Sequence, residues 1–272
     1  MSPKDSMTEI DKITRKRDNL IKIKDLSFNI GNAMILEDIS FFVHEGEYVS
    51  VIGPNGSGKT TLLKCMNRIY TAQKGNIIID GISLKAYKQK DLAKLIGYVP
   101  QATNQAYPFT VYEFVLMGRY PYFSPFSPPN KEDRKAVMEA LGLTNTGAFI
   151  NRAMGTLSGG ERQKIFIAAA LAQGAKILLL DEPATFLDPR HQDDIQDILI
   201  RVNRESGVTI VAATHHINSA LYASHRIIAL KEGKILFCGI PDELINKGLL
   251  DRIYDKSFVF MKHPKTDKPV VL

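Results

Sequence analysis

The sequence has few of the residues that form disulfide frameworks or membrane spans. Its 272 residues include no tryptophan and two cysteines, Cys65 and Cys238, which share no metal-ligand spacing with each other or with histidine. Such a free pair in apolar sequence suggests a reducing compartment. The longest apolar run, Ile165–Ala172, is far shorter than the ~20 residues that a membrane span needs. The first residues are polar and lack the apolar stretch of a secretory signal. We therefore expect a cytoplasmic chain that does not cross a membrane itself.

Neither sign of charge is in strong excess. Lys and Arg number 35 against 29 Asp and Glu, a net charge of +6. A basic excess can attract nucleic acid or an anionic membrane. Only the stretch Lys12–Arg17 forms a cluster, however, so we interpret the excess as scattered solvated lysines and expect no nucleic-acid partner. The length allows one large domain, or a core with a subdomain. We predict a flexible polar tail over residues 1–18 and one folded domain over residues 19–272.

The first part of the folded chain carries strand patterns. Apolar residues alternate from Ile21 to Ile30 with one slip at Asp25, and a similar segment follows it. Together these segments predict an antiparallel β layer joined to a buried strand. The predicted strands are Ile21–Ile30, Ile35–Val43, Tyr48–Ile52 and Asn76–Asp80.

The middle of the chain, about residues 101–165, is predicted to be an inserted helical subdomain. The segment Val111–Arg119 has a helical pattern, and a loop with four prolines follows it. Asn130 can then cap a helix over Lys131–Leu143, whose first turn is acidic as the helix dipole prefers.

The last part alternates strands and helices. Ala175–Pro183 and Val208–Thr214 read as strands buried on both faces, and a helix that begins near His191 stops near Gly207. A hairpin turning at Glu232-Gly233 follows. Alternation of strands with helices predicts a parallel α/β sheet.

A glycine-rich loop lies between the strand Tyr48–Ile52 and a predicted helix Thr61–Ile69. It reads GPNGSGKT and matches G-x-x-x-x-G-K-[ST] in full. In such a loop the backbone N–H groups surround phosphates, the lysine reaches the β/γ oxygens and the Thr hydroxyl faces Mg²⁺. The loop therefore predicts an ATP or GTP site. Its predicted binding residues are Gly53, Asn55, Gly56, Ser57, Gly58, Lys59, Thr60 and Thr61.

The apolar run ILLLDE ends in two carboxylates, Asp181 and Glu182. Phosphoryl transfer depends on positioning and charge stabilisation, so one metal carboxylate and one water-directing group form a minimal set. We expect Asp181 beside Thr60 at a Mg²⁺ ion and Glu182 facing the attacking water.

A second glycine-rich turn, TLSGGERQK, opens a predicted helix Glu161–Gln173 but has no lysine. A turn of this kind can hold a phosphate at a helix N-terminus. It lacks the lysine of the first loop, so these residues alone leave its role open. Its candidate residues are Ser158, Gly159 and Gly160.

In their order along the chain these motifs resemble an ABC-transporter ATPase subunit. The likeness rests on the P-loop, Gln101 after IGYVP, LSGGE, LLLDEP, the pair Leu187-Asp188 and the His after VAAT, and it spans about residues 21–250. It implies a P-loop NTPase with a RecA-like core, which uses ATP and Mg²⁺ for hydrolysis. It also implies that Gln101 links the Mg²⁺ site to the helical subdomain, that His215 contacts the γ-phosphate, and that Asp188 lies in a loop crossing between subunits. The LSGG turn would meet the ATP of another subunit, in a head-to-tail homodimer.

Two further stretches resemble one subfamily. VLMGRYPYFSP is similar to the GRxPH stretch of iron-siderophore, haem and cobalamin importers, and LDPRHQ to their LDxxHQ run. The likeness implies integral membrane permease subunits, an extracytoplasmic substrate-binding protein and a peripheral place on the cytoplasmic face of the cell membrane. The region Tyr107–Pro129 is our candidate docking surface. Molybdate and zinc uptake ATPases stay open, as does a soluble ABC ATPase that serves DNA repair, translation or cluster assembly. An ATP-binding switch with little turnover is disfavoured by Glu182.

Four positions depart from the family pattern. Glu161 replaces the commoner Gln of LSGGQ, a variation that many members share. Ala184 stands where Thr is usual, and His216 where Asp usually follows the switch histidine. Ile30 stands where the family often places an aromatic residue against adenine. Phe28, two residues earlier, is the candidate substitute.

Overall fold

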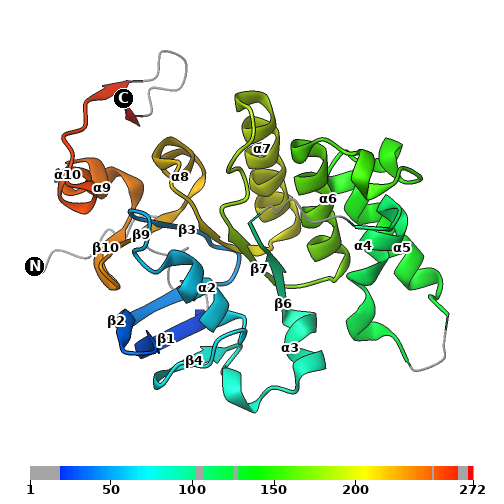
Figure 1. Cartoon of the computed structure of the whole chain (residues 1–272), viewed down its shortest axis with the longest axis horizontal. Helices are drawn as coiled ribbons and strands as arrows, with labels where there is room; N and C mark the ends of the chain where they lie inside the picture. Colours follow the sequence, from blue (N-terminus) through cyan, green and yellow to red (C-terminus); the bar gives the residue numbers. More distant parts are fainter. Residues whose placement is uncertain (1–18, 102–106, 125–127, 247, 263–268, 272) are drawn as a thin grey trace, which may run out of the picture.

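A computed structural model describes residues 19–101, 107–124, 128–246, 248–262 and 269–271 (Figure 1). The tail predicted over residues 1–18 lies outside these ranges. The described residues form a six-stranded sheet, a four-stranded sheet, a group of helices between β6 and β7, and a C-terminal segment of short elements that includes a two-stranded sheet.

The central sheet has six strands in the order β10-β9-β3-β8-β7-β6. Four of its five strand pairings are parallel, and at one edge β10 pairs antiparallel with β9. Every residue of β3, β7 and β8 is buried, which explains their mostly apolar sequences, and the pairing confirms the predicted parallel sheet. The strands are β3 (Tyr48–Ile52), β6 (Ile96–Val99), β7 (Ile177–Asp181), β8 (Thr209–Ala213), β9 (Arg226–Lys231) and β10 (Lys234–Gly239).

The two faces of the central sheet pack against different layers. Alternate residues of one strand point to opposite faces, so Leu179 joins the core under the β layer while Leu178 and Leu180 join the core under the helices. Each such fully buried side chain contributes about 1.5–3 kcal/mol. The sheet is therefore held from both sides, and its strand ends are fixed in position.

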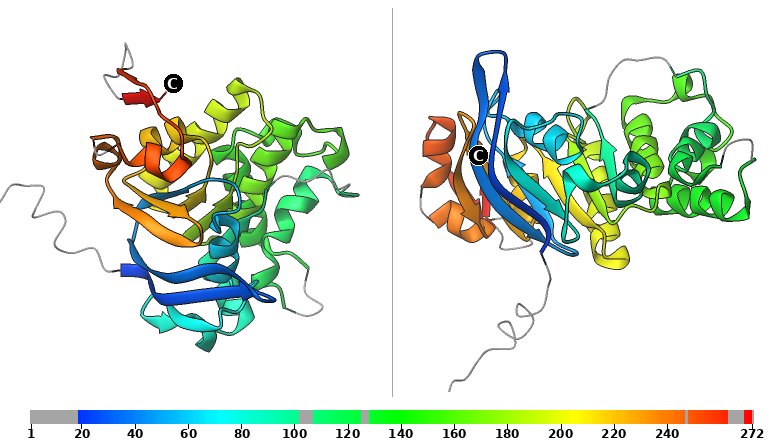
Figure 2. Two further views of the ribbon diagram at one scale, coloured as in Figure 1. Left: turned by 60° about the vertical axis from the view of Figure 1, so that its left-hand side comes forward. Right: turned by 90° about the horizontal axis from the view of Figure 1, so that it is seen from below.

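The predicted antiparallel β layer is confirmed. Its order is β2-β1-β4-β5, all antiparallel, with strands β1 (Asn19–Ile30), β2 (Ala33–His44), β4 (Lys74–Ile79) and β5 (Ile82–Ser83). The slip at Asp25 is a real irregularity, because Asp25 has a φ of +51° and the pairing register shifts between Ile23 and Leu26. Figure 2 shows this layer in blue, on the far side of the central sheet from the green helices.

The segment between β6 and β7 is helical. It holds α4 (Val111–Met117), α5 (Lys131–Leu143) and α6 (Gly159–Ala172), with 3-10 turns at Tyr120–Tyr122, Gly147–Phe149 and Met154–Thr156. Asn130 caps α5 as predicted, accepting a hydrogen bond from the backbone N–H of Asp133 at 2.9 Å. The boundary near residue 165 falls inside α6, which continues to pack on β6.

The remaining helices flank the central sheet. The long α7 (Pro189–Ser206) buries Ile195, Ile198, Leu199 and Val202 and ends at Gly207, whose φ of +65° is typical of a helix stop. The others are α2 (Lys59–Met66), the 3-10 turn Leu84–Ala86, α3 (Gln89–Leu95), α8 (Ile217–Ala223), α9 (Pro241–Asn246) and α10 (Leu249–Tyr254), followed by the antiparallel strands β11 (Phe260–Lys262) and β12 (Pro269–Val271). In the described ranges, no helix has both the length and the apolar content for a bilayer span.

Candidate functional site

The glycine-rich loop runs directly from β3 into α2. Gly53, its first residue, has a φ of +147°, and a Cβ there would overlap the carbonyl oxygen of Leu230. Gly58 has a φ of +102° and stands at the N-terminus of α2 without a side-chain cap. Only glycine suits these two positions. The loop therefore presents uncapped backbone N–H groups at a helix N-terminus, where an anion is favoured.

Lys59 is the cation of this loop. Its side chain is buried, and its Nζ donates hydrogen bonds to the carbonyl oxygens of Gly53 at 2.8 Å and Pro54 at 3.0 Å. Burial lowers the pKa of Lys59, while the carboxylates of Glu182 and Asp181 act in the opposite direction. The ammonium group thus lies inside the loop, near the end of β7.

Asp181, the last residue of β7, faces the start of α2. Its Oδ1 accepts a hydrogen bond from the Thr60 hydroxyl at 2.8 Å, and its Oδ2 accepts one from the Tyr98 hydroxyl at 3.2 Å. Burial raises the pKa of Asp181, and these two hydrogen bonds oppose the rise. The predicted pairing of Thr60 with Asp181 is present in the geometry. Tyr98 is an orienting partner that the sequence did not single out.

Glu182 follows in an unusual conformation. Its φ is +50°, and its backbone N–H donates to Ala213 on β8 at 2.9 Å. Its Oε2 accepts a hydrogen bond from the Thr185 hydroxyl at 2.8 Å and lies 3.0 Å from Nδ1 of His215. A strained backbone at a cleft is a frequent sign of a functional position. Both contacts fall on one carboxylate oxygen and orient the group.

His216 lies against His215, with ring centroids 4.2 Å apart. Burial, and secondarily His215, lower the pKa of His216. The backbone N–H of His216 donates to the Thr214 hydroxyl at 3.0 Å. An Asp at this position would carry a negative charge, whereas His216 supplies a ring that packs on His215.

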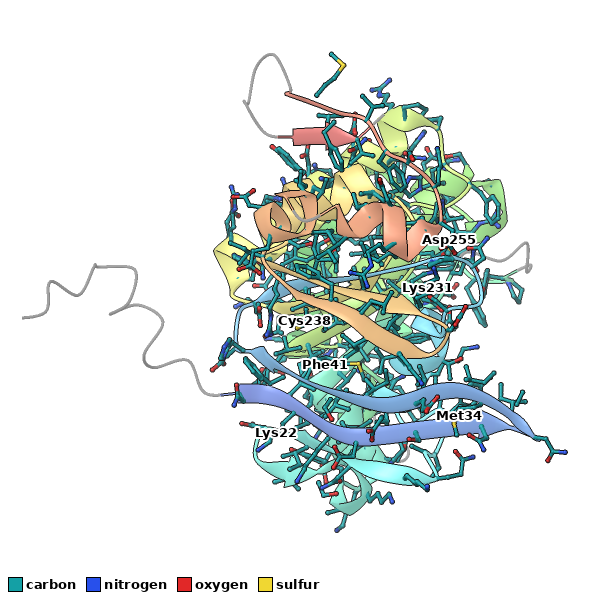
Figure 3. The ribbon with its side chains drawn as sticks, turned by 90° about the vertical axis from the view of Figure 1, so that its left-hand side faces the viewer. Lys22, Met34, Phe41, Lys231, Cys238 and Asp255 are labelled. Atoms are coloured by element: carbon teal, nitrogen blue, oxygen red, sulfur yellow. The ribbon has the colours of Figure 1, made fainter. Side chains whose placement is uncertain are left out.

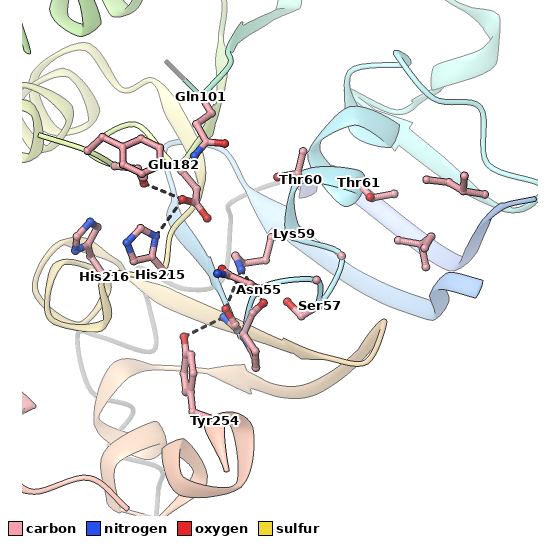
Figure 4. A pocket seen from close by; sticks show the side chains of 18 residues that line it. Asn55, Ser57, Lys59, Thr60, Thr61, Gln101, Glu182, His215, His216 and Tyr254 are labelled. Carbon is pink, nitrogen blue, oxygen red and sulfur yellow. Dashed lines mark hydrogen bonds and ion pairs between the residues drawn. The ribbon is translucent and has the colours of Figure 1, made fainter. Parts of the chain in front are cut away.

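Except for Asp181 and Tyr98, these groups line one cleft of about 1000 Å³ (Figure 4). Asp181 is hydrogen-bonded to Thr60, which does line it. It brings together the loop residues 53–61 with Gln101, Glu182 and His215, which come from three other strand ends. Parallel strands bring such residues to one edge of a sheet. Thr185, Phe186, His216 and Tyr254 also line the cleft, and none of these had been predicted as a site residue.

The predicted residues Ser158, Gly159, Gly160 and Asp188 do not line this cleft. They form a second cluster at the starts of α6 and α7. The Ser158 hydroxyl accepts a hydrogen bond from the backbone N–H of Glu161, whose carboxylate in turn accepts one from the N–H of Ser158 at 2.8 Å. Such a capping box fixes the start of a helix. Glu161, in place of the commoner Gln, is thus a capping residue.

The two helix starts of this cluster touch through His191. Nδ1 of His191 lies 2.7 Å from Oδ2 of Asp188, and the His191 ring occupies the space where a Cβ on Gly160 would stand. The hydrogen bonds from His191 lower the pKa of Asp188. Gly160 is therefore a glycine because a neighbouring ring passes over it. His191 lies in the LDPRHQ run, which had been noted only as a likeness.

The suggestion that Phe28 stacks on adenine is wrong. Phe28 is buried and stacks on Tyr70 with ring centroids 5.2 Å apart, inside the core of the β layer. Irregular pairing of β1 with β2 on either side of Phe28 shifts the alternation that the suggestion assumed. Ile30 is 54% exposed and lines the cleft together with Ile35. That end of the cleft offers aliphatic side chains.

The sheet order, the loop at the end of β3 and the Thr60–Asp181 pair define a P-loop nucleoside triphosphatase. Comparison with family models identifies which family of P-loop nucleoside triphosphatases the chain belongs to. Residues 36–185 match the model of the ABC transporter family, and the chain belongs to that family, as an ATP-binding, ATP-hydrolysing subunit.

Two relatives match over almost their full length. The iron(3+)-hydroxamate import ATP-binding protein FhuC of Bacillus subtilis is 38% identical over 254 residues, 93% of this chain and 94% of that protein. The ferric enterobactin transport ATP-binding protein FepC of Escherichia coli is 38% identical over 250 residues, 92% of each chain.

A solved structure of similar fold is a dimeric ATP-binding cassette in a post-hydrolysis state, bound to ADP and Pi. It superposes with a TM-score of 0.70 at 32% sequence identity, over 81% of this chain and 98% of that one.

Proposed function

We propose that the protein is the ATPase subunit of an importer that takes up a metal chelate of the ferric siderophore, haem or cobalamin class. One observation carries this proposal. The chain is 38% identical, over nearly its full length, to an ATPase named for iron(3+)-hydroxamate import and to one named for ferric enterobactin transport. These siderophores differ in chemistry, so identity to the ATPases supports the chelate class and does not distinguish its members. The chelate itself would pass through integral membrane permease subunits supplied by an extracytoplasmic binding protein. This chain would sit peripherally on the cytoplasmic face of the membrane.

The proposed nucleotide is ATP, held by the residues 53–61, with Mg²⁺ beside it. Mg²⁺ prefers oxygen ligands and keeps phosphate oxygens and waters in its shell. The donors present fit it, because the Thr60 hydroxyl and the Asp181 carboxylate lie 2.8 Å apart and Gln101 lines the same cleft. When bound, the ion would neutralise charge on the phosphates. Lys59 would supply a second positive charge at the β/γ oxygens.

Glu182 and His215 are the proposed catalytic pair. Thr185 and His215 engage one oxygen of the Glu182 carboxylate, and the side chain is 14% exposed in the cleft. A carboxylate held in this way can orient a water and accept its proton. His215 is 41% exposed and is the proposed contact to the γ-phosphate.

The proposed working form is a head-to-tail homodimer. In one chain the cleft residues and the cluster of Ser158, Gly159, Gly160 and Asp188 are separate, so each chain would contribute two different halves. The LSGG turn and Asp188 of one subunit would close over the ATP held by Lys59 of the other. That a solved structure of similar fold is dimeric supports the pairing of two chains.

Co-purification tests the transporter assignment. A tagged chain extracted from its own cells in detergent should carry an integral membrane permease with it. Turnover stimulated by nucleic acid, with no membrane protein retained, would instead assign the chain to the soluble ABC ATPases.

The proposed permease contact lies in the described parts of Tyr107–Pro129. Within Gly118–Phe123, Tyr120 is 76% exposed. Arg119 is not a suitable probe, because it binds Asp133 at 3.0 Å and the carbonyl oxygen of Ala172 at 3.0 Å. A Cβ on Gly118 would overlap the carbonyl oxygen of Ala169. The surface is thus tested at Tyr120.

Tyr120→Glu should reduce transport and permease retention by roughly tenfold, about 1.4 kcal/mol, as loss of one aromatic anchor does. Basal ATP hydrolysis should stay within about twofold, because the side chain contacts neither cluster. Met34→Glu is the matched control, since Met34 is 52% exposed on β2. If Tyr120→Glu transports as well as Met34→Glu, this surface is not the docking site.

A further inference from the structure

A tyrosine from the far end of the chain lies on the glycine-rich loop. Tyr254 ends α10, and its hydroxyl oxygen accepts a hydrogen bond from the backbone N–H of Gly53 at 3.1 Å (Figure 4). The two residues are 201 positions apart. Burial raises the pKa of Tyr254 to about 12, so the phenol stays protonated at neutral pH. Its contact with the loop is therefore that of a neutral hydroxyl group.

Gly53 is held on three sides. Its N–H is bound by Tyr254, its Cα faces the carbonyl oxygen of Leu230 too closely for any side chain, and its own carbonyl oxygen accepts the hydrogen bond from Lys59. The N–H and the carbonyl of one residue thus connect Tyr254 to the ammonium group. A shift of Tyr254 would move Gly53 and, with it, the carbonyl oxygen that accepts the hydrogen bond from Lys59.

Helix α10 is held by hydrogen bonds to β9, close to Gly53. Nζ of Lys231, the residue after Leu230, donates to the carbonyl oxygen of Arg252 at 2.8 Å and to Asp255 at 2.6 Å. Figure 3 shows Lys231 and Asp255 close together at the end of the orange hairpin. The same strand, β9, therefore places Leu230 on one side of Gly53 and holds the helix that places Tyr254 on the other.

The segment that follows Tyr254 also makes contacts that hold it in place. The Tyr254 ring contacts Phe258 edge to face at 5.7 Å, and the backbone N–H of Phe258 donates to Asp251 at 3.0 Å. Near the end of the chain, Val271 exchanges two hydrogen bonds with the side chain of Asn218 on α8, at 2.8 and 3.0 Å. The contacts of Phe258 with the Tyr254 ring and with Asp251 thus hold the segment after α10 against that helix.

We propose that Tyr254 is a positioning residue of the nucleotide site, which fixes the first residue of the phosphate-binding loop and, through Gly53, sets Lys59 for the β/γ phosphates. The proposal concerns ATP binding by this chain. It does not depend on which molecule the transporter carries.

Tyr254→Phe removes the hydroxyl and keeps the ring. We expect the KM for ATP to rise about fivefold, the effect of losing one hydrogen bond of ordinary strength. The kcat should stay within about twofold, because Lys59 contacts the phosphates in the ground state and in the transition state alike. The amide proton resonance of Gly53 should move upfield by NMR as its acceptor is lost.

Tyr87→Phe is the matched control. The Tyr87 hydroxyl donates to the carbonyl oxygen of Ile79 at 2.9 Å in the β layer, away from the cleft. It should lower Tm slightly and leave the KM for ATP unchanged. If Tyr254→Phe also changes only Tm, Tyr254 serves packing alone and the proposal is wrong. An unmoved Gly53 resonance would contradict the hydrogen bond itself.

Discussion

Replacement of Glu182 by Gln should abolish ATP turnover and leave ATP binding intact. Gln has the same length and can still accept hydrogen bonds from Thr185 and His215, so the segment 182–186 after β7 should keep its shape. It cannot accept a proton from water, and removing a general base costs typically 10²–10⁴-fold in rate. The protein should therefore bind ATP, fail to hydrolyse it and accumulate as an ATP-dependent dimer.

Gel filtration with and without ATP detects the dimer, and phosphate release measures turnover. Glu139→Gln is the control, since Glu139 is exposed on α5, where it forms an ion pair with Lys135 at 3.6 Å. It should hydrolyse ATP like the wild type. Near-wild-type hydrolysis by Glu182→Gln would rule out Glu182 as the base.

The second large effect is expected at Gly160, in the separate half of the site. A Cβ at this position would overlap the ring of His191, so Gly160→Ala must displace either the start of α6 or the Asp188–His191 pair. A displacement of about 1 Å in a positioning group can cost about 10²-fold in rate. Binding of ATP to the single chain should stay within about twofold, because Gly160 does not line the cleft.

Gly142→Ala is the control for this substitution. Gly142 is also helical, nothing stands within 4 Å of its Cβ position, and Ala is the better helix former. Gly142→Ala should therefore leave ATP hydrolysis unchanged.

A double variant tests the contact between Gly160 and His191. Gly160→Ala combined with His191→Ala should lose less activity than the sum of the losses of the two single variants, as expected for residues in contact. Full additivity would show that the two residues act independently.

Mixed dimers test whether the two halves belong to different subunits. A Lys59→Ala chain combined with a Gly160→Ala chain forms one site with both defects and one intact site. Such mixtures should recover part of the hydrolysis that each variant lacks alone. No recovery in a dimer shown to form would contradict the head-to-tail arrangement.

The parts of the site that could be predicted from sequence are those encoded in short, contiguous stretches. The loop residues 53–61 and the pair Asp181-Glu182 directly follow buried strands, and parallel strands bring such ends together. The irregularity at Asp25 was also visible in the alternation of apolar residues. In each case the local sequence determines the local conformation.

Other parts depend on packing between distant segments. Phe28 turned inward because the register of β1 with β2 shifts on both sides of it, and a single strand pattern does not report such shifts. Tyr254 reaches Gly53 from a helix of six residues, α10, too short to give a periodic signal. The ring of His191, on α7, lies over Gly160 at the start of α6. These contacts follow from the tertiary fold.

The central claim is that ATP hydrolysis by this chain drives uptake of a metal chelate. The direct measurement is uptake of radioactive iron, supplied as hydroxamate or catecholate chelates, by cells with the gene deleted. Deletion should reduce uptake of at least one chelate to background, and the wild-type chain but not Glu182→Gln should restore it. The claim would be contradicted if the deletion left uptake of these chelates, of haem and of cobalamin unchanged. Loss of molybdate or zinc uptake instead would assign the chain to another importer.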